Sequence, residues 1–295
     1  MGSDAHLILI GADERLVDSL VERLEELELR WSRFISSSEL SRLNAGSGMP
    51  TVVSHETMML IERAVWAWQA TGGLFDPTVL SAVISAGYTK SFDQLGDVVV
   101  KTPGAAETEV PGCAGIELNP SINLVQLPAG VGIDPGGIGK GLAADLVAVE
   151  AVERGATAAL CSLGGDLRVV GDPPSEGWEV ELDHFLDREA RINLHAGAVA
   201  TSSTLRRRWS TDEGEAHHVI DPRTALPSTG EVVACSVIAA EAWWAEALAT
   251  AILVGWGQPN PEHELTDLLD QTGALVTLSS SEQLTSGPFA ESFSL

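Results

Sequence analysis

The run from Gly132 to Gly141, here called the glycine loop, restricts the fold of this chain more than any other segment. Five of its ten residues are glycines, and an apolar periodic segment follows it to about Arg154. Glycine lacks a Cβ atom, so the backbone of the loop can approach another group closely. The helix predicted after the loop directs free N–H groups and the positive end of its dipole to the same point. The loop therefore indicates either a phosphate site or a tight structural turn, and the turn is the more common use.

The spacing of the glycines excludes the two common phosphate-binding loops. A Walker loop needs Gly five residues before Gly139 and Ser or Thr after Lys140, but the chain has Asp134 and Gly141 at these positions. A dinucleotide fingerprint reads G-x-G-x-x-G, whereas the last three glycines of this loop read G-x-G-x-G. The loop alone does not identify its ligand.

Charge and hydropathy limit the function classes. The chain has 295 residues and a formal net charge of −25, from 42 acidic and 17 basic residues. Repulsion therefore opposes nonspecific binding to nucleic acid or to anionic membrane surfaces. No apolar stretch reaches the roughly 18 residues of a membrane-spanning helix, and residues 6–10 predict a first strand rather than a signal peptide. We expect a cytoplasmic protein without membrane insertion or a nucleic-acid partner.

The order of helical and strand-like segments predicts an α+β fold with mixed or antiparallel sheets and flanking helices. Leucines at positions 16, 20, 24 and 27 form one apolar stripe, which predicts a helix over about 13–34. Further helices are predicted over 56–70, 76–87, 242–254 and 261–272, and strands over 158–163, 178–183, 191–194, 198–201, 217–220, 231–239 and 274–278. Since no repeat or long linker interrupts the pattern, we expect one domain over 1–295 with a peripheral polar tail at 279–295.

Six short motifs follow one another along the chain and need a common explanation. They are Gly73–Thr78, Asp134–Gly141 with Asp145 one turn later, Ser162–Asp166, Ala200–Ser202, His217–Thr224 and Ala245–Ala251. Each motif alone is weak or moderate. In this order, together with Met1-Gly2 and the segment 38–44, they resemble the ApbE-like family of FAD:protein FMN transferases from residue 1 to about residue 257.

The resemblance implies a T-fold-related architecture and a magnesium-dependent reaction. FAD would be cleaved, its FMN half attached to a Thr or Ser of an acceptor flavoprotein, and AMP released. Two alternatives stay open: an FAD-binding protein without transfer activity, and an FAD pyrophosphatase that gives FMN and AMP. The sequence does not indicate which protein is the acceptor, nor the oligomeric state.

For the metal and the chemistry, the resemblance implies Mg²⁺ ligands at Glu246 and Thr250 and at the backbone carbonyl of Ala143. Glu246 and Thr250 lie four positions apart on a predicted helix, so their side chains share one face. The family usually has Asp where this chain has Glu246, and Mg²⁺ tolerates distorted geometry poorly. We therefore expect metal binding with an altered geometry. His218 corresponds to a family histidine that contacts FAD, and it could also take the proton of the acceptor hydroxyl.

For the flavin ring, the resemblance points to Met1, to Phe34, which could stack on the isoalloxazine, and to the segment Leu74, Phe75 and Asp76. Lys140, Asp145 and Thr201 are the residues expected to contact the rest of the nucleotide.

Two further positions carry expectations. The cluster Arg206, Arg207 and Arg208 could attract a nucleotide or an acidic partner loop, although a solvated face is the simpler interpretation. Ala225 stands where the family usually has Gly, a difference that costs stability only if φ is positive there.

Overall fold

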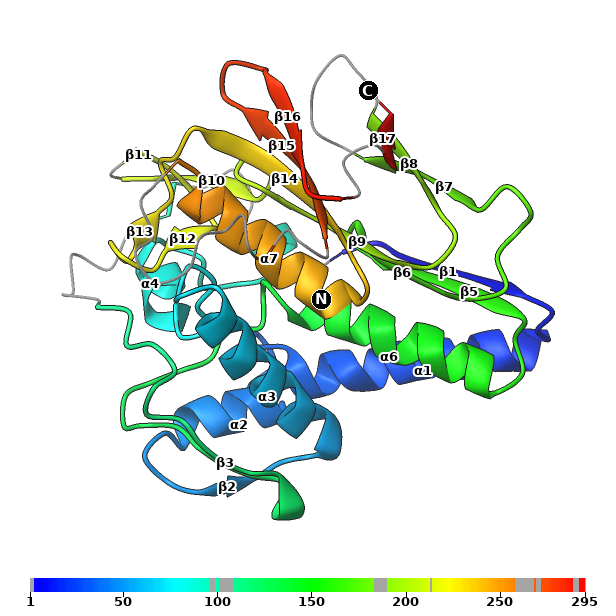
Figure 1. Ribbon diagram of the computed structural model, residues 1–295. Helices are drawn as coiled ribbons and strands as arrows, with labels where there is room; N and C mark the ends of the chain where they lie inside the picture. Colours follow the sequence, from blue (N-terminus) through cyan, green and yellow to red (C-terminus); the bar gives the residue numbers. More distant parts are fainter. Residues whose placement is uncertain are drawn as a thin grey trace.

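The computed structural model of the protein (Figure 1) describes residues 3–95, 99–100, 109–182, 190–212, 214–257, 268, 272–288 and 292–294. The predicted helix over 261–272 lies outside the described residues apart from positions 268 and 272, and so does Met1. Within the described ranges, no helix combines the length and the apolar composition needed to cross a membrane.

A seven-stranded sheet forms the centre of the molecule, with the strand order β1-β5-β6-β9-β14-β15-β16. Its strands are β1 (Ala5–Ile10), β5 (Ala158–Leu163), β6 (Asp166–Gly171), β9 (Gly197–Ser203), β14 (Val232–Ala239), β15 (Gly273–Leu278) and β16 (Gln283–Ser286). Every neighbouring pair is antiparallel. The predicted α+β class with antiparallel sheets is confirmed.

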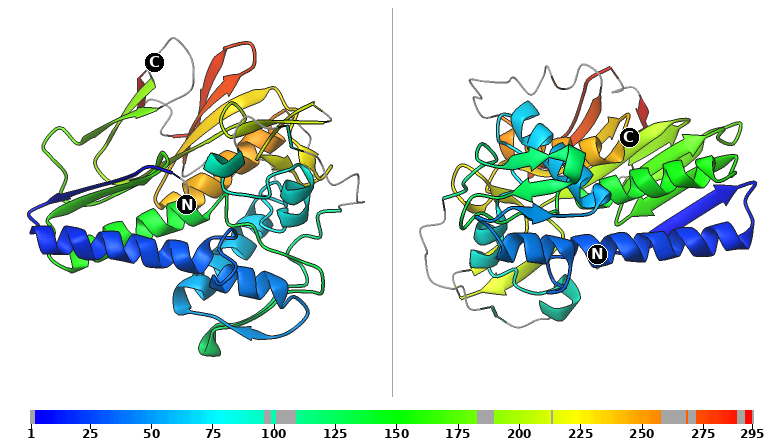
Figure 2. Two further views of the ribbon diagram at one scale, coloured as in Figure 1. Left: turned by 180° about the vertical axis from the view of Figure 1, so that it is seen from behind. Right: turned by 90° about the horizontal axis from the view of Figure 1, so that it is seen from below.

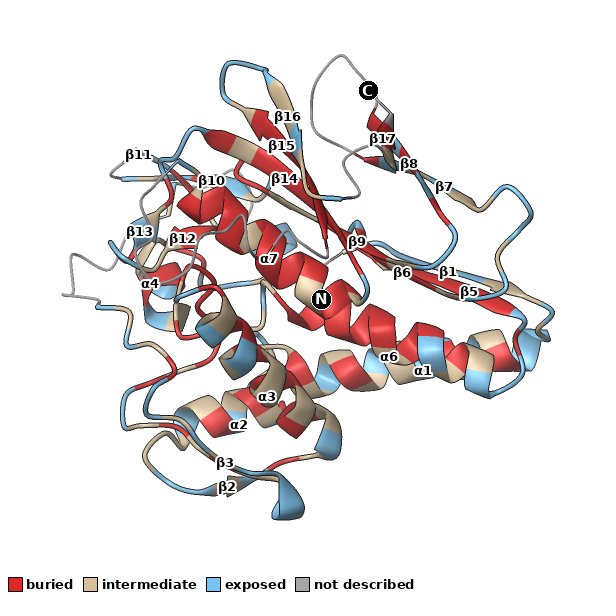
Figure 3. Ribbon diagram, in the orientation of Figure 1, coloured by how far each residue is buried: buried red, intermediate tan, exposed pale blue. Residues whose placement is uncertain are grey.

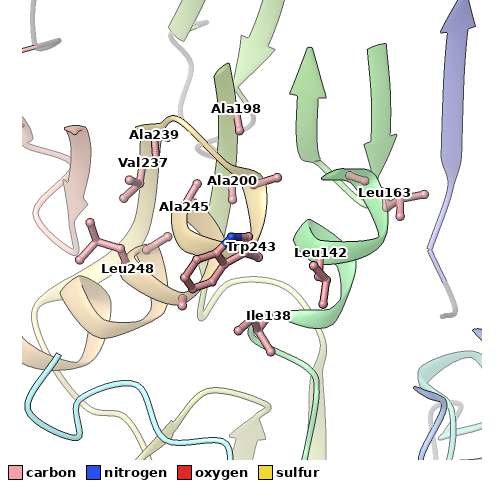
Figure 4. Packing of buried hydrophobic residues seen from close by; sticks show 14 of the residues in the cluster. Ile138, Leu142, Leu163, Ala198, Ala200, Val237, Ala239, Trp243, Ala245 and Leu248 are labelled. Carbon is pink, nitrogen blue, oxygen red and sulfur yellow. The ribbon is translucent and has the colours of Figure 1, made fainter. Parts of the chain in front are cut away.

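Two buried helices, α6 (Gly139–Glu153) and α7 (Ala242–Gly255), cover one face of this sheet (Figure 1). Figure 4 shows residues at this contact, where the small side chains of Ala245 of α7 and Ala200 of β9 lie in one buried cluster with the larger Leu248 of α7 and Val237 of β14. Small residues let the helix approach the strands closely, and this close contact buries α7 along nearly its whole length (Figure 3).

An outer helix layer covers α6 and α7. Helix α1 (Glu14–Trp31) runs beside α6, as both views of Figure 2 show, and α3 (His55–Ala70) packs on α7. The predicted leucine stripe of α1 faces inward, because Leu16, Leu20 and Leu27 are buried in the core shared with α6. Asp13 caps this helix by accepting the Leu16 N–H at 2.9 Å.

A small three-stranded sheet covers the opposite face of the central sheet. It consists of β7 (Trp178–Leu182), β8 (Ala190–Leu194) and β17 (Phe293–Ser294) in the order β17-β8-β7. Its apolar side chains pack on residues of the central sheet such as Leu160, Val199 and Ile238. The C-terminal tail therefore supplies an edge strand to each of these two sheets.

The remaining elements lie outside the central sheet and its two covering helices, and many of their apolar residues pack in two smaller cores. They are α2 (Glu39–Ala45), α4 (Leu80–Ser85), α5 (Phe92–Leu95), a sheet of β2 (Thr51–Val52), β4 (Leu124–Gln126) and β3 (Glu117–Asn119), and the pairs β10 (Arg208–Thr211) with β11 (Gly214–His217) and β12 (Ile220–Asp221) with β13 (Leu226–Pro227). The strand predicted over 217–220 is divided in two, since β11 pairs with β10 and β12 pairs with β13. Ala225 has φ +56°, a left-handed conformation that costs a non-glycine residue about 1–2 kcal/mol.

The glycine loop owes its glycines to close packing rather than to unusual backbone angles, since none of the five has a positive φ. A Cβ atom on Gly141 would lie 2.3 Å from the Ala242 carbonyl oxygen, and one on Gly137 would lie 3.0 Å from the Phe75 ring. The first turn of α6 thus touches the first turn of α7 backbone to backbone. Gly141 therefore serves helix packing, a role that neither the phosphate-site nor the tight-turn interpretation had assigned to it.

We expect Gly141→Ala to lower the free energy of unfolding by about 3 kcal/mol, because the added methyl group meets backbone atoms that cannot rotate away. Urea unfolding followed by circular dichroism measures the change. Gly230→Ala is the matched control, because its Cβ would stay 3.7 Å from the nearest atom. Equal stability of the two variants would contradict the tight α6–α7 contact.

Candidate active site

A cavity of about 990 Å³ lies where the glycine loop, α7 and β9 meet. Its volume is at the upper end of the range for small-molecule sites, which suits a ligand as large as a dinucleotide. Eight of the residues expected at the site line it together: Leu74, Phe75, Asp76, Lys140, Thr201, His218, Glu246 and Thr250. The fold thus gathers residues that are up to 176 positions apart in the chain.

Lys140 is the central charge of the cavity. Its Nζ atom lies 2.9 Å from Oδ2 of Asp166 and also donates to Oε1 of Glu246. The second oxygen of Glu246 accepts the Gly141 N–H at 2.8 Å. One ammonium group therefore joins the first turn of α6 to β6 and α7.

Two carboxylates share this one ammonium group in a buried place, where Glu246 is 3% exposed and Asp166 1%. Burial raises the pKa of Glu246 to about 8, with the Asp166 charge acting in the same direction and Lys140 opposing both. Burial alone would lower the pKa of Lys140, but the two carboxylates raise it, so the ammonium stays charged. The cluster consequently favours one further positive charge, which a proton or a metal cation can supply.

Thr250 follows Glu246 by one turn on α7, and both side chains reach the cavity as the spacing predicts. Its Oγ1 atom lies 2.8 Å from Oγ of Ser202 and donates to the Glu246 carbonyl at 3.2 Å. Carboxylate and hydroxyl oxygens are the donors that hard cations such as Mg²⁺ prefer.

The oxygen atoms of Glu246 and Thr250 suit a hard cation but are too few to complete its coordination shell. Among the described residues, no group of three His, Cys, Asp or Glu side chains is placed to hold a metal ion. Ala143 is fully buried inside α6 and does not line the cavity. A cation at Glu246 and Thr250 would therefore complete its shell with hydroxyl, water or phosphate oxygens.

Asp145 contacts α7 rather than the cavity. Its two oxygens accept the N–H groups of Ala242 and Trp243, both at 2.9 Å, and Arg168 lies 3.3 Å away. Burial raises the pKa of Asp145 to about 6 against these stabilising bonds. The carboxylate satisfies the N-terminus of α7, and Asp145 is not among the residues that line the cavity.

The two adjacent histidines have different surroundings. His217 ends β11, and its Nε2 atom lies 2.9 Å from the Ser228 carbonyl oxygen. His218 falls in the break between β11 and β12 and lines the cavity, and its Nδ1 atom is buried without a partner among the described residues. Burial, followed by the charges of Arg207 and Lys140, lowers the pKa of His218 to about 3. The ring is therefore neutral at physiological pH and able to accept a proton.

Asp76 and Thr201 are held by hydrogen bonds at the cavity wall. Asp76 accepts the Thr78 N–H at 2.8 Å and its hydroxyl at 2.6 Å, and burial raises the pKa of Asp76 against these bonds. The backbone N–H of Thr201 donates to Asp166 at 3.2 Å, and its hydroxyl lies 2.6 Å from that of Ser236.

Phe34 lies at a smaller pocket of about 90 Å³ that shares Lys140, Tyr88 and Arg207 with the large cavity. Its ring is 40% exposed and lies 5.6 Å from the ring of Tyr88. The Arg33 guanidinium sits 4.1 Å above the Phe34 ring and pairs with Asp134 at 2.8 Å. Phe34 is thus an exposed aromatic beside the cavity, although one face of its ring is already covered.

Comparison with known proteins decides the family. The sequence profile of the ApbE family matches residues 1–264. The chain belongs to the ApbE family. The FAD:protein FMN transferase of Treponema pallidum (strain Nichols) is 28% identical over 253 residues, which cover 78% of this chain and 68% of that protein. The corresponding protein of Vibrio cholerae is 27% identical over 251 residues, 82% of this chain and 74% of its own length.

Solved structures agree with the ApbE assignment. The crystal structure of the ApbE protein from Thermotoga maritima has a TM-score of 0.84 at 26% identity, covering 97% of this chain and 94% of that one. The flavin transferase ApbE from Vibrio cholerae has a TM-score of 0.79 at 22% identity and covers 99% and 96% of the two chains. The whole described fold is that of the family.

Sequence reasoning missed three residues of this ApbE site. Asp166 stands in a recognised motif, but no role was inferred for it. Tyr88, the chain's one tyrosine, belongs to no motif and gives no signal. Arg207 belongs to the cluster for which a solvated face was preferred over attraction of a nucleotide or an acidic partner loop, and the structure places it in the wall of both pockets.

We expect Lys140→Met to lower the free energy of unfolding by about 3 kcal/mol, because it leaves two buried carboxylates without their cation. Adding Glu246→Gln should recover part of this loss, since the second change removes one of the unpaired charges. Chemical unfolding of both single variants and the double variant gives the coupling free energy. Strictly additive losses would show that the ammonium does not stabilise the carboxylates.

Proposed function

We propose that this chain cleaves FAD, attaches the FMN moiety to a Thr or Ser of an acceptor flavoprotein and releases AMP. The observation that carries the proposal is the meeting of Lys140, Glu246, Thr250 and His218 in one cavity of dinucleotide size. Relatives named FAD:protein FMN transferase and an ApbE structure of the same fold support it.

We further propose that Mg²⁺ is the cofactor and that Glu246 and Thr250 hold it, with Ala143 remaining a predicted ligand. A hard cation bound there would neutralise charge on the phosphate oxygens of FAD. The excess of carboxylate over ammonium charge at Lys140 supports this assignment, as does the oxygen chemistry of the donor set.

His218 is the proposed base for the acceptor hydroxyl. As the hydroxyl oxygen bonds to the flavin-side phosphorus, its proton passes to the neutral imidazole. The bond from that phosphorus to the bridging oxygen breaks, and AMP departs with the bonding electron pair. The position of His218 supports this role, because the ring lines the cavity and its Nδ1 atom has no partner among the described residues.

The other proposed nucleotide contacts come from residues that line the two pockets. Leu74, Phe75 and Asp76, with Phe34 at the adjoining pocket, are proposed to contact the flavin ring. Lys140 and Thr201 are proposed to contact phosphate or ribose oxygens. Contacts of Met1 and Asp145 with FAD remain predictions.

Incubation with FAD, Mg²⁺ and a candidate acceptor domain tests the function. We expect a covalent adduct of FMN mass on the acceptor, detected by mass spectrometry of the intact protein, together with free AMP. Bound but intact FAD would contradict transfer and favour a flavin-binding protein, an alternative that the pairing of Glu246 with Lys140 makes relevant. Free FMN without adduct would indicate a pyrophosphatase.

We expect Thr250→Val to reduce the rate of FMN transfer at least about tenfold and to raise the Mg²⁺ concentration needed for half-maximal rate, because it removes one proposed ligand without changing side-chain shape. Thr272→Val is the matched control, since Thr272 also donates to the carbonyl four residues earlier and does not line the cavity. Titration of the transfer rate with Mg²⁺ measures both. Identical titration curves for the two variants would remove Thr250 from the metal site.

A further inference from the structure

We propose that Arg207 binds the flavin-side phosphate of the dinucleotide and so forms an anion subsite between the large cavity and the aromatic pocket. The inference rests on the proposed function and adds to it a specific role for one arginine of the cluster 206–208, for which the sequence left nucleotide attraction only as an alternative to a solvated face.

Arg207 lies at the junction of the two pockets and lines both of them. Its Nη2 atom donates to Oγ of Ser3 at 2.7 Å. Ser3 in turn lies against Gly164, because a Cβ atom on that glycine would be 2.9 Å from Ser3 and 3.6 Å from the stem of Lys140. Ser3, Gly164, Lys140 and Arg207 therefore form one continuous stretch of cavity wall.

The charge of Arg207 is not neutralised within the described part of the chain. No ion pair joins it to a described carboxylate, although the chain carries 42 acidic residues. Lys140, the neighbouring cation, is already shared by Asp166 and Glu246. Arg33 beside the smaller pocket is likewise paired, with Asp134. Apart from the Nη2 donation to Ser3, Arg207 can therefore bind an anion that enters the cavity.

Arg207 interacts electrostatically with two neighbours in the cavity wall. Both Arg207 and Lys140 act on His218, and the two cations also act on each other. The charge of Lys140 is balanced by Asp166 and Glu246, whereas no described carboxylate pairs with Arg207, so an anion beside Arg207 would balance its charge. A phosphate group meets this requirement, and the planar guanidinium suits two of its oxygens.

The backbone of Arg207 is in a strained conformation that aims the side chain. Its φ is +48°, in the left-handed region that non-glycine residues rarely adopt. Arg207 lies between β9 and β10, and Trp209, two residues later, is buried and donates to the Ala86 carbonyl at 2.8 Å. The loop therefore holds Arg207 in place, whereas the next residue, Arg208, is exposed and lines neither pocket.

The position of Arg207 beside two aromatic residues indicates which of the two FAD phosphates it binds. Arg207 shares the smaller pocket with Phe34 and Tyr88, the residues suited to contact a ring. The phosphate of FAD nearest to such a ring is the one that stays with FMN. Arg207 is therefore assigned to this phosphate and not to the phosphate that leaves with AMP.

Arg207→Asn tests the subsite, because Asn removes the charge and tolerates a left-handed backbone. We expect FAD and FMN to bind about tenfold or more weakly to this variant, whereas riboflavin, which has no phosphate, binds as it does to the wild type. Quenching of flavin fluorescence measures all three affinities. Arg208→Asn, the matched control, should bind all three ligands normally, and an unchanged thermal midpoint should show that Arg207→Asn is folded.

Several outcomes would overturn the assignment. Unchanged FAD affinity would do so, as would equal losses for FMN and riboflavin, which indicate a structural role. A higher acceptor KM with normal FAD binding would instead place an acidic acceptor segment at Arg207. A wild-type protein that binds no FAD would refute the proposed function itself, whereas a transferring wild type with an unaffected Arg207→Asn variant would refute only the subsite.

Discussion

The shared Lys140 ammonium group is the interaction on which the site depends. It joins the first turn of α6 to Asp166 of β6 and Glu246 of α7, while the Gly141 N–H binds the other oxygen of Glu246. This arrangement requires the two helix ends to lie in contact, and the missing side chain of Gly141 makes that contact possible. Packing and electrostatics at the site thus have one common origin, the close approach of α6 and α7.

The identity of residue 246 matters within this arrangement. A glutamate reaches both the ammonium of Lys140 and the backbone of the neighbouring helix, so its two oxygens are engaged within the protein. The aspartate usual in the family is shorter by one methylene group. Any cation that Glu246 binds must therefore share the carboxylate with Lys140.

Much of the fold could be predicted because the residues that a helix or strand buries recur in the sequence at a regular spacing. The leucine stripe of α1 and the apolar run of β5 have the spacing that their elements require. The division at His218 could not be predicted, since it depends on pairing partners, with β10 for one strand and β13 for the other. Which residues pair across a fold is information that a single strand does not carry.

The candidate site shows the same division between local and long-range information. Glu246 and Thr250 were identified through the family resemblance, and their helical spacing predicted the shared face that both present to the cavity. Asp145 lies one turn after the glycine loop and was expected to contact the nucleotide. Its hydrogen bonds instead go to α7, almost a hundred positions later. Tyr88 and Arg207 reach the pockets only through the tertiary fold.

The strongly acidic composition does not prevent this protein from holding an anionic substrate. At physiological ionic strength, charges more than about 8 Å apart in solvent are largely screened. The net charge of −25 therefore acts mainly on large polyanions that span the surface, such as nucleic acid. Inside the cavity, Lys140 and Arg207 are close to any bound ligand and act through partly buried surroundings. The distance between charges and their screening by salt thus explain how one protein can repel nucleic acid at its surface and still hold a dinucleotide in its cavity.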